Sequence, residues 1–413
     1  MHIILFEDNH APQLFPATIA RPAFAINIGT YRLIDLALQF GGHVEVTTRP
    51  YLRELVKLDF TELWTPEKCQ RSAPILALNA RAVPHVELFQ KIREIVKQGQ
   101  SGIVRTADSI ACALFTQENP FPHESIGSSQ LMGIIEDKGL KPLNLQFPML
   151  NYAHDIVWHQ LQIMNDNMNF RLKTGEYSEI ADGVFSADGQ PLGQYCITDT
   201  SAGPIIFESG VRIGSFCCFK GPVYVGRNSK INEYTALKDS VTIAHTAKVG
   251  GEVEGSVIEA YSNKQHHGFL GHSYLGSWIN LGAGTSNSDL KNTYGEVTME
   301  YGGTKVKTGM QFVGCFMGDY AKTAINTSIF TGKTIGACSM LYGFITTNVP
   351  SFVNYARTFG QVTEAAAETL VVTQARMFAR RNVVPRPCDI QLLRDVYEMT
   401  KHERQLANEP LSL

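Results

Sequence analysis

The chain has 413 residues, which is enough for two or three domains and a large buried core. Its 36 basic and 39 acidic residues give a net charge of −3, so the sequence lacks the basic field that holds nucleic acid. No apolar run reaches the roughly 18 to 20 residues of a membrane span, and the eight cysteines include no C-x-x-C pair. We therefore expect a soluble, cytoplasmic protein with reduced thiols, no zinc ribbon, and no nucleic-acid or membrane partner.

In the N-terminal part of the chain, short β-rich runs alternate with helical runs. Strands are expected at 2–6, 44–47 and 75–78, and a helix is expected over 86–96, where apolar residues recur every three or four positions. This alternation predicts an α/β, Rossmann-like domain over residues 1–195. Ligands of such domains usually bind beyond the carboxyl ends of the strands.

A hexapeptide repeat marks the second half of the chain. Every sixth residue from Phe207 to Val249 is apolar, and the residue four places after each is small or β-branched. A period of six fits neither a 3.6-residue helix nor a heptad, but it fits a three-sided solenoid with 18 residues per coil. The same phase resumes at Phe269, Leu275 and Leu281.

The repeat predicts a parallel β-helix over residues 196–350. Its phase returns from 317 to 341, where Thr323 is the polar exception. Two stretches, 254–268 and 286–309, interrupt the phase and are too long for solenoid corners, so we expect them to protrude as loops. Loops that protrude from a rigid solenoid are where function is usually found.

A helical arm is predicted over residues 351–413. An apolar stripe along its first helix ends in the basic cluster Arg376, Arg380 and Arg381, and Asp389 is the N-cap candidate of a second helix. Such an arm is expected to cover a solenoid end or a neighbouring subunit. The alternative is that its arginines reach a phosphate.

Two stretches in the middle of the repeat carry the chemistry. Residues 262–276 contain His266, His267 and His272, and residues 280–292 read NLGAGTSNSDLKN. These stretches resemble the left-handed β-helix acyltransferases. Within them they resemble the bifunctional N-acetylglucosamine-1-phosphate uridylyltransferase / glucosamine-1-phosphate N-acetyltransferase family, in a divergent bacterial branch. The resemblance implies a left-handed coil and a homotrimer with active sites between subunits.

The resemblance also assigns roles position by position. His266 matches the catalytic histidine, Asn280 a substrate-binding asparagine, and Ala283 the residue whose N–H faces the thioester carbonyl of acetyl-coenzyme A. An imidazole with a pKa near 6.5 suits removal of a proton from an amino group, and a fixed N–H stabilises charge on the carbonyl oxygen. Further candidates are Phe269, Asp289, Lys291 and Lys264 for the substrate, and Cys315, Ala337, Lys305, Lys307, Lys322 and Lys333 for coenzyme A.

The N-terminal domain lacks the family's glycine-rich phosphate loop, G-x-G-T-R-M followed by a lysine. In its place we expect Arg21, Gly29, Arg32 and Asn79 to contact a nucleotide, since arginine also binds phosphates. Asn79 stands where the family has a metal-binding aspartate, and an uncharged amide binds Mg²⁺ more weakly. Asp8 or Asp108 is therefore the candidate to supply the missing carboxylate.

These features together predict a trimeric enzyme of UDP-N-acetylglucosamine synthesis, a route to cell-wall precursors. It would acetylate an amino-sugar 1-phosphate with acetyl-coenzyme A and then transfer a uridylyl group from UTP with Mg²⁺. One alternative is a zinc hydratase like the γ-type carbonic anhydrases, with His267, His272 and His245 as ligands. Two others are a sugar-nucleotide-binding protein with a silent N-terminal domain, and a noncatalytic scaffold.

Overall fold

The computed structural model describes residues 1–63, 73–106, 109–117, 121 and 128–405. The chain divides into two compact units. The N-terminal unit comprises Met1–Leu14, Arg21–Ile26 and Tyr31–Asn151, and the C-terminal unit comprises Phe15–Ala20, Asn27–Thr30 and Tyr152–Leu413. None of the described helices has the length and hydropathy of a transmembrane span.

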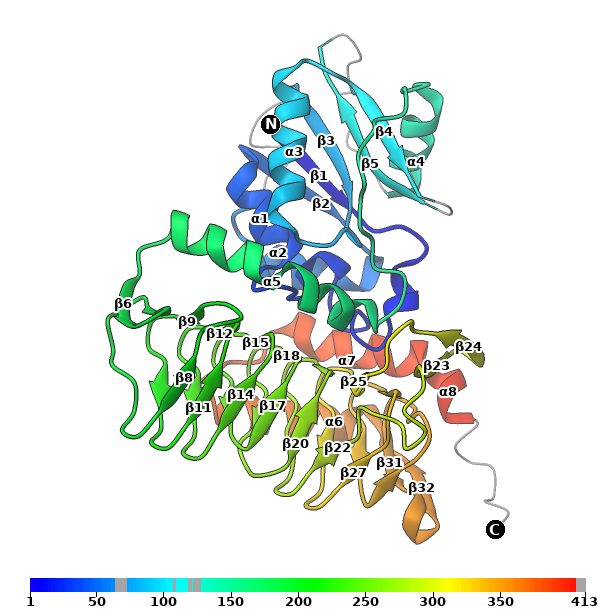
Figure 1. Cartoon of the computed structure of the whole chain (residues 1–413). Coiled ribbons are helices and arrows are strands. Elements are labelled where there is room, and N and C mark those ends of the chain that lie inside the picture. The colour runs from blue at the N-terminus through cyan, green and yellow to red at the C-terminus, as the bar shows by residue number, and fades with distance from the viewer. Residues whose placement is uncertain (64–72, 107–108, 118–120, 122–127, 406–413) are drawn as a thin grey trace. The chain divides into compact units, whose positions relative to one another are not determined.

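The N-terminal unit is an α/β domain around one mixed sheet of strand order β2-β1-β3-β5-β4 (Figure 1). Strands β1 to β3 are parallel to one another, and β5 and β4 run antiparallel to their neighbours. The strands are β1 (His2–Phe6), β2 (His43–Thr47), β3 (Ile75–Asn79), β4 (Gly102–Arg105) and β5 (Ile110–Phe115). The helices are α1 (Leu33–Phe40), α2 (Arg53–Asp59), α3 (Val86–Lys97) and α4 (Ser128–Asp137), with short 3₁₀ turns at Ala11–Leu14, Ala23–Ala25 and Pro50–Leu52.

Burial explains the central strands of this sheet. Every residue of β1, β3 and β5 is buried, as expected for apolar strands that are covered on both faces. The three strands and the helix expected from the sequence are confirmed, and Val86, Phe89 and Ile92 are buried on α3. Because β1, β2 and β3 are parallel, their carboxyl ends lie along one edge of the sheet.

The C-terminal unit consists of the helix α5 (Asp155–Thr174), a left-handed parallel β-helix and a C-terminal arm. One face of the β-helix carries β6 (Ser178–Ala181), β7 (Val184–Ser186), β9 (Ile205–Phe207), β12 (Val223–Val225), β15 (Val241–Ile243), β18 (Val257–Ile258), β21 (Tyr274–Leu275), β25 (Cys315–Met317) and β28 (Lys333–Ile335). A second face carries β8 (Ile197–Asp199), β11 (Cys218–Lys220), β14 (Ala236–Lys238), β17 (Glu252–Glu254) and β20 (Phe269–Gly271), then β22 (Ser286–Asn287), β27 (Ser328–Ile329) and β30 (Phe344–Ile345). The third face carries β10 (Arg212–Ile213), β13 (Lys230–Ile231), β16 (Lys248–Val249), β19 (Asn263–Lys264), β26 (Lys322–Thr323), β29 (Met340–Leu341), β31 (Val353–Ala356) and β32 (Gln361–Glu364).

Strand registers confirm the 18-residue coil. Val223 pairs with Val241, and Lys230 pairs with Lys248, each 18 residues further along the chain. Seven of the eight residues of the repeat between Phe207 and Val249 lie in one buried cluster, and Ile213 packs against it. The large apolar residue of each side therefore points to the solenoid axis.

The first predicted excursion, 254–268, is wrong: this stretch stays in the coil. Strands β18 and β19 lie within it, and Lys248 pairs with Asn263, only 15 residues further on. Shorter connections in this coil shift the phase of the repeat, so the period of six loses its register although the solenoid continues. As a result Leu270 lies in the core cluster, and Phe269, which the period placed inside, is only half-buried.

The second predicted excursion is confirmed. Ser286 pairs with Ser328, 42 residues further on, and the extra chain includes an antiparallel hairpin of β23 (Thr298–Tyr301) and β24 (Thr304–Lys307). The polar exception Thr323 is buried and satisfied, because its hydroxyl lies 2.7 Å from that of Thr285 and accepts the N–H of Gly282.

The C-terminal arm begins later than the sequence indicates. The strand β31 continues the solenoid by pairing with β29, and the helices follow as α6 (Ala367–Ala379), α7 (Pro387–Met399) and α8 (Lys401–Gln405). The N-cap prediction for Asp389 is wrong: α7 starts at Pro387, so Asp389 lies in its first turn, where its carboxylate accepts the N–H of Arg386.

The main continuous segment of the C-terminal unit begins at Tyr152, whereas the sequence placed the domain boundary near residue 195. The reason is the packing of α5, whose Met164 and Met168 form a buried cluster with Ile206 and Tyr224 of the β-helix.

Candidate functional site

The loop that carries His266 connects β19 to β20 and is fixed from inside the solenoid by Lys264. Lys264 pairs with the core residue Val249, so its side chain points to the axis and is only 2 % exposed. Its Nζ donates to the carbonyls of Gly250 at 2.8 Å, His266 at 2.9 Å and Gly268 at 2.7 Å. Burial lowers the pKa of Lys264 to about 8.

The side chains of His266 and His267 are both exposed at this loop. Among the described residues, the imidazole of His266 forms no hydrogen bond, so its nitrogens are available to a substrate. On the next coil, the half-buried Ala283 accepts the N–H of Asn326 through its carbonyl, whereas its own N–H has no acceptor in the described part of the chain. A free imidazole and a free N–H are the two groups that the sequence assigned to acyl transfer.

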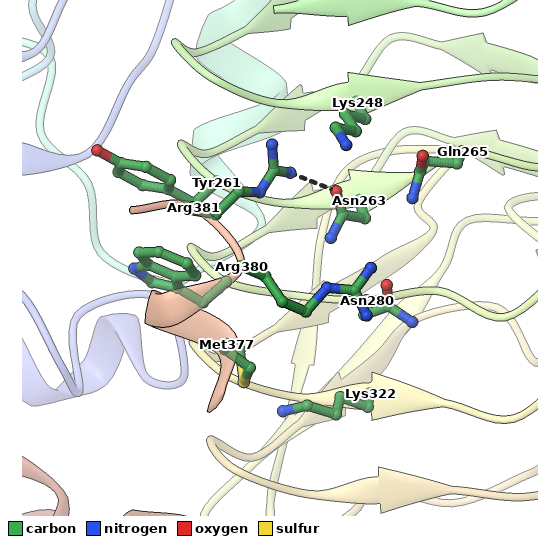
Figure 2. Close-up of a pocket in the computed structure, with 10 residues that line it drawn as sticks. Lys248, Tyr261, Asn263, Gln265, Asn280, Lys322, Met377, Arg380 and Arg381 are labelled. Carbon is green, nitrogen blue, oxygen red and sulfur yellow. Dashed lines mark hydrogen bonds between the residues drawn. The ribbon is translucent and has the colours of Figure 1, made fainter. Parts of the chain in front are cut away.

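Beside the loop lies a cavity of about 240 Å³. One wall is a column of polar side chains on the third face of the solenoid, where Lys248 pairs with Asn263, Asn263 with Asn280, and Asn280 with Lys322. The other wall is the end of α6 (Figure 2). The lining residues are Lys248, Tyr261, Asn263, Gln265, Trp278, Asn280, Lys322, Met377, Arg380 and Arg381.

Stacked aromatic rings hold α6 against the solenoid. Trp278 stacks on Tyr261 with ring centroids 4.2 Å apart and on Phe378 of α6 at 4.4 Å. One residue beyond Arg380, the guanidinium of Arg381 donates to Asn263 at 2.6 Å. These contacts fix the position of both arginines relative to the polar column.

The cations around the cavity raise one another's electrostatic energy. Burial lowers the pKa of Lys248, and the charges of Arg381 and Arg380 lower it further. Burial and the neighbouring Arg380 also lower the pKa of Arg381, and burial lowers that of Lys322.

Other predicted site residues lie elsewhere on the solenoid, and their roles stay predictions. Cys315 and Ala337 are fully buried, and burial raises the pKa of the Cys315 thiol to about 12. Asp289 accepts a hydrogen bond from Nδ1 of His272 at 2.8 Å. Lys291 donates to the carbonyl of Glu296 within the second excursion, Lys305 and Lys307 are exposed on β24, and Lys333 is half-buried on β28.

The three histidines of the zinc alternative do not gather in one chain. Nδ1 of His272 is engaged by Asp289, and that of His245 lies 3.1 Å from the hydroxyl of Thr246. Among the described residues, His267, His272 and His245 form no group with ligand atoms close enough for one metal ion.

In the N-terminal unit, the predicted metal ligand Asp8 is engaged by a buried arginine. Arg81 is 2 % exposed and donates to both carboxylate oxygens, from Nε at 2.9 Å and from Nη2 at 2.7 Å. The amide of Asn79 donates to the same carboxylate at 2.8 Å. A guanidinium thus lies where a cation would have to bind, so this donor set does not fit Mg²⁺. Asp108 lies outside the described residues.

The predicted nucleotide contacts are spread over different local structures. Arg32 pairs with Asp35 at the start of α1, at 2.6 Å. The carbonyl of Arg21 accepts a hydrogen bond from Arg49, which also pairs with the buried Glu7 after β1. Gly29 has a positive φ of 58° and donates its N–H to Gln160 of α5 at 2.5 Å, in the C-terminal unit. These residues also remain candidates.

Sequence reasoning missed half of the polar column. It selected Asn280 and Lys322, but not Lys248 or Asn263, and it also missed Gln265, which lines the same cavity. A signal was present, because basic residues precede the inward residue once per coil at Arg212, Lys230, Lys248 and Lys322. The contribution of α6 to the cavity depends on long-range packing, which no local pattern reveals.

Comparisons with known proteins agree with the resemblance seen in the sequence. Residues 3–174 match the family model described as sugar nucleotidyl transferase. The chain is 32 % identical over 135 residues to a bifunctional sugar-1-phosphate nucleotidylyltransferase/acetyltransferase of Sulfurisphaera tokodaii, covering 33 % of each chain. It is 31 % identical over 144 residues to the bifunctional protein GlmU of Methanococcus vannielii, covering 34 % of each. The chain thus matches about a third of the length of these relatives. Over that matched third, the resemblance to bifunctional nucleotidyltransferase/acetyltransferases is confirmed.

Solved structures similar to the chain are acyltransferases of low sequence identity. The UDP-N-acetylglucosamine acyltransferase of Francisella novicida is 14 % identical, covering 54 % of this chain and 81 % of its own, with a TM-score of 0.25. A Bacillus cereus protein described as a putative acetyltransferase is 15 % identical, covering 51 % of this chain and 98 % of its own, with a TM-score of 0.24.

Proposed function

We propose that the C-terminal unit transfers an acetyl group from acetyl-coenzyme A to the amino group of an amino-sugar 1-phosphate. The observation that carries this proposal is the imidazole of His266, which is exposed and forms no hydrogen bond with the described residues, on a loop held in place by Lys264. Gln265, the residue before His266, lines the cavity between the polar column and the end of α6. The bifunctional relatives support the same activity.

The transfer needs a base, an oxyanion donor and a place for the phosphate. His266 takes a proton from the substrate ammonium, and the freed amine attacks the thioester carbonyl carbon. The N–H of Ala283 stabilises the negative charge on the carbonyl oxygen. The nitrogen of the tetrahedral adduct loses its second proton to solvent. The adduct then breaks its C–S bond, which releases coenzyme A as a thiolate, and the imidazolium of His266 returns the first proton to that thiolate.

We also propose that the N-terminal unit transfers a uridylyl group from UTP to the acetylated sugar phosphate. The family match over residues 3–174 supports a sugar nucleotidyl transferase domain. Magnesium enters no step of this proposal through Asp8, because both oxygens of that carboxylate are held by Arg81. The homotrimer and the cytoplasmic location stay predictions.

Two adjacent histidines allow a matched test of acetyl transfer. We expect His266→Ala to lower the rate of coenzyme A release from acetyl-coenzyme A and glucosamine 1-phosphate by at least about 100-fold. The control is His267→Ala, since His267 is also exposed on the same loop, and we expect it to keep most of the activity. The thiol is measured colorimetrically, and the acetylated sugar is identified by mass spectrometry.

Near-normal acetylation by His266→Ala would remove His266 from the mechanism. Equal losses in both variants would indicate a damaged loop rather than a lost base. For the N-terminal unit, pyrophosphate release from UTP and N-acetylglucosamine 1-phosphate is the expected result, and no release with any nucleoside triphosphate would refute nucleotidyl transfer.

A further inference from the structure

We propose that the cavity between the polar column and the end of α6 is a phosphate-binding site, and that Arg380 and Arg381 of the arm supply part of it. The ligand class is a phosphate ester or diphosphate. This site is distinct from the base and the oxyanion donor of the acetyl transfer, although its ligand is expected to be one of the substrates of that reaction.

The first argument is the sign of the charge. Lys248, Lys322, Arg380 and Arg381 line the cavity, and none of the ten lining residues is acidic. In the described part of the chain, no carboxylate forms an ion pair with any of the four cations. Four cations that face one cavity without a counter-charge destabilise each other until an anion binds.

The second argument is the supply of unused donors. The guanidinium of Arg380, the ammonium of Lys248 and the amides of Gln265 and Asn280 form no hydrogen bond with other described residues. Figure 2 shows the guanidinium of Arg380 beside the amide of Asn280, with Lys322 on the following strand. Guanidinium and amide N–H groups converging on one cavity match the oxygens of a phosphate.

The third argument is preorganisation. The stack of Tyr261, Trp278 and Phe378 holds the end of α6, and Arg381 is tied to Asn263. The backbone at both arginines and the side chain of Arg381 are therefore positioned before a ligand arrives, which reduces the entropy lost on binding. A packing arm with no ligand would not need two arginines turned toward the polar column. Arg376, which lies on the same helix, does not line the cavity.

The test is calorimetric titration of the whole chain with inorganic pyrophosphate. We expect binding that weakens as salt is raised, and Arg380→Gln/Arg381→Gln should weaken it at least about tenfold. The matched control is Arg376→Gln, which should bind as the wild type does. If the double variant has lost its fold, as judged by circular dichroism, Lys248→Gln is the second variant and should also weaken binding.

Further titrations identify the source of the phosphate. Coenzyme A and glucosamine 1-phosphate are titrated into wild type and double variant, and the ligand that loses affinity is the one whose phosphate occupies the cavity. No pyrophosphate binding, or equal affinity in all variants, would overturn the proposal. Since binding needs no acetyl transfer, a chain whose pyrophosphate binding weakens in the double variant but which does not acetylate would refute the proposed acetyl transfer and leave this site standing.

Discussion

The ion pair of Asp8 and Arg81 gives the sharpest prediction about the N-terminal unit. Both side chains are buried, at 6 % and 2 % exposure. Asp8→Asn removes the negative charge and leaves the guanidinium of Arg81 without a counter-charge in a low-dielectric environment. We expect the free energy of unfolding to fall by about 3–5 kcal/mol, the usual effect of removing one partner from a buried pair.

A second variant separates the charge from the other contacts of Arg81. Its guanidinium also donates to Ser109 Oγ and to the carbonyl of Leu150, each at 2.6 Å. Asp8→Asn/Arg81→Met also removes the guanidinium that Asp8→Asn leaves without a counter-charge. The double variant should therefore lose less free energy of unfolding than the sum of the losses in Asp8→Asn and Arg81→Met, by about 1–3 kcal/mol. The control is Glu87→Gln, because Glu87 pairs with Lys91 on the surface. This substitution should lower the free energy of unfolding by less than about 1 kcal/mol.

The assay is urea unfolding followed by far-UV circular dichroism, with and without Mg²⁺. Burial raises the pKa of Asp8, but the hydrogen bonds and charge of Arg81 outweigh it and hold that pKa below 3.8. The unfolded chain therefore takes up this proton first, so the stability from Asp8 is present above pH 3.8 and is lost as the pH falls below it. A loss under about 1 kcal/mol in Asp8→Asn, or stabilisation of the wild type alone by Mg²⁺, would refute the structural role.

Two further predictions concern the C-terminal unit. Burial lowers the pKa of Lys264 from 10.5 to about 8, so the unfolded state holds this proton more tightly than the folded state. As the pH rises from about 8 to 10.5, the free energy of unfolding of the wild type should therefore increase by on the order of 3 kcal/mol relative to that of Lys264→Met. Urea midpoints at both ends of that range measure it, and parallel curves for the two proteins would contradict it. Trp278→Ala removes both aromatic stacks that hold α6, worth about 0.5–1.5 kcal/mol each, so trypsin should cleave after Arg380 several-fold faster. Trp158→Ala, at an exposed tryptophan of α5, should leave that cleavage rate unchanged.

Much of the architecture could be predicted because it rests on local periodicity. The apolar residue at every sixth position from Phe207 to Val249 became the core of the β-helix, and the strand 2–6 became β1. The error over 254–268 has a physical cause: a coil that is a few residues shorter breaks the phase of the repeat without breaking the stack of strands. A period can locate a regular coil, but it cannot show that an irregular one still pairs with its neighbours.

In the candidate site, too, some residues could be selected from local sequence and others could not. Local sequence was enough to propose His266, Asn280 and Ala283, because the resemblance assigns roles to them through a short motif. It was not enough for Lys264 or Asp8, whose charges were expected to meet ligands and are instead satisfied by carbonyls and by Arg81. Whether a buried charge is free depends on its partners, and these come from distant parts of the chain.

The sequence by itself thus determined the α/β domain, the three-sided coil and the histidine loop, since each follows from spacing along one stretch of chain. Only the tertiary structure decided that Lys248, Asn263, Asn280 and Lys322 form one column, and that Arg380 and Arg381 face it across a cavity. The physical reason is that stacking coils and docking a helix bring together residues more than a hundred positions apart, and the charge of a site is a property of that assembly.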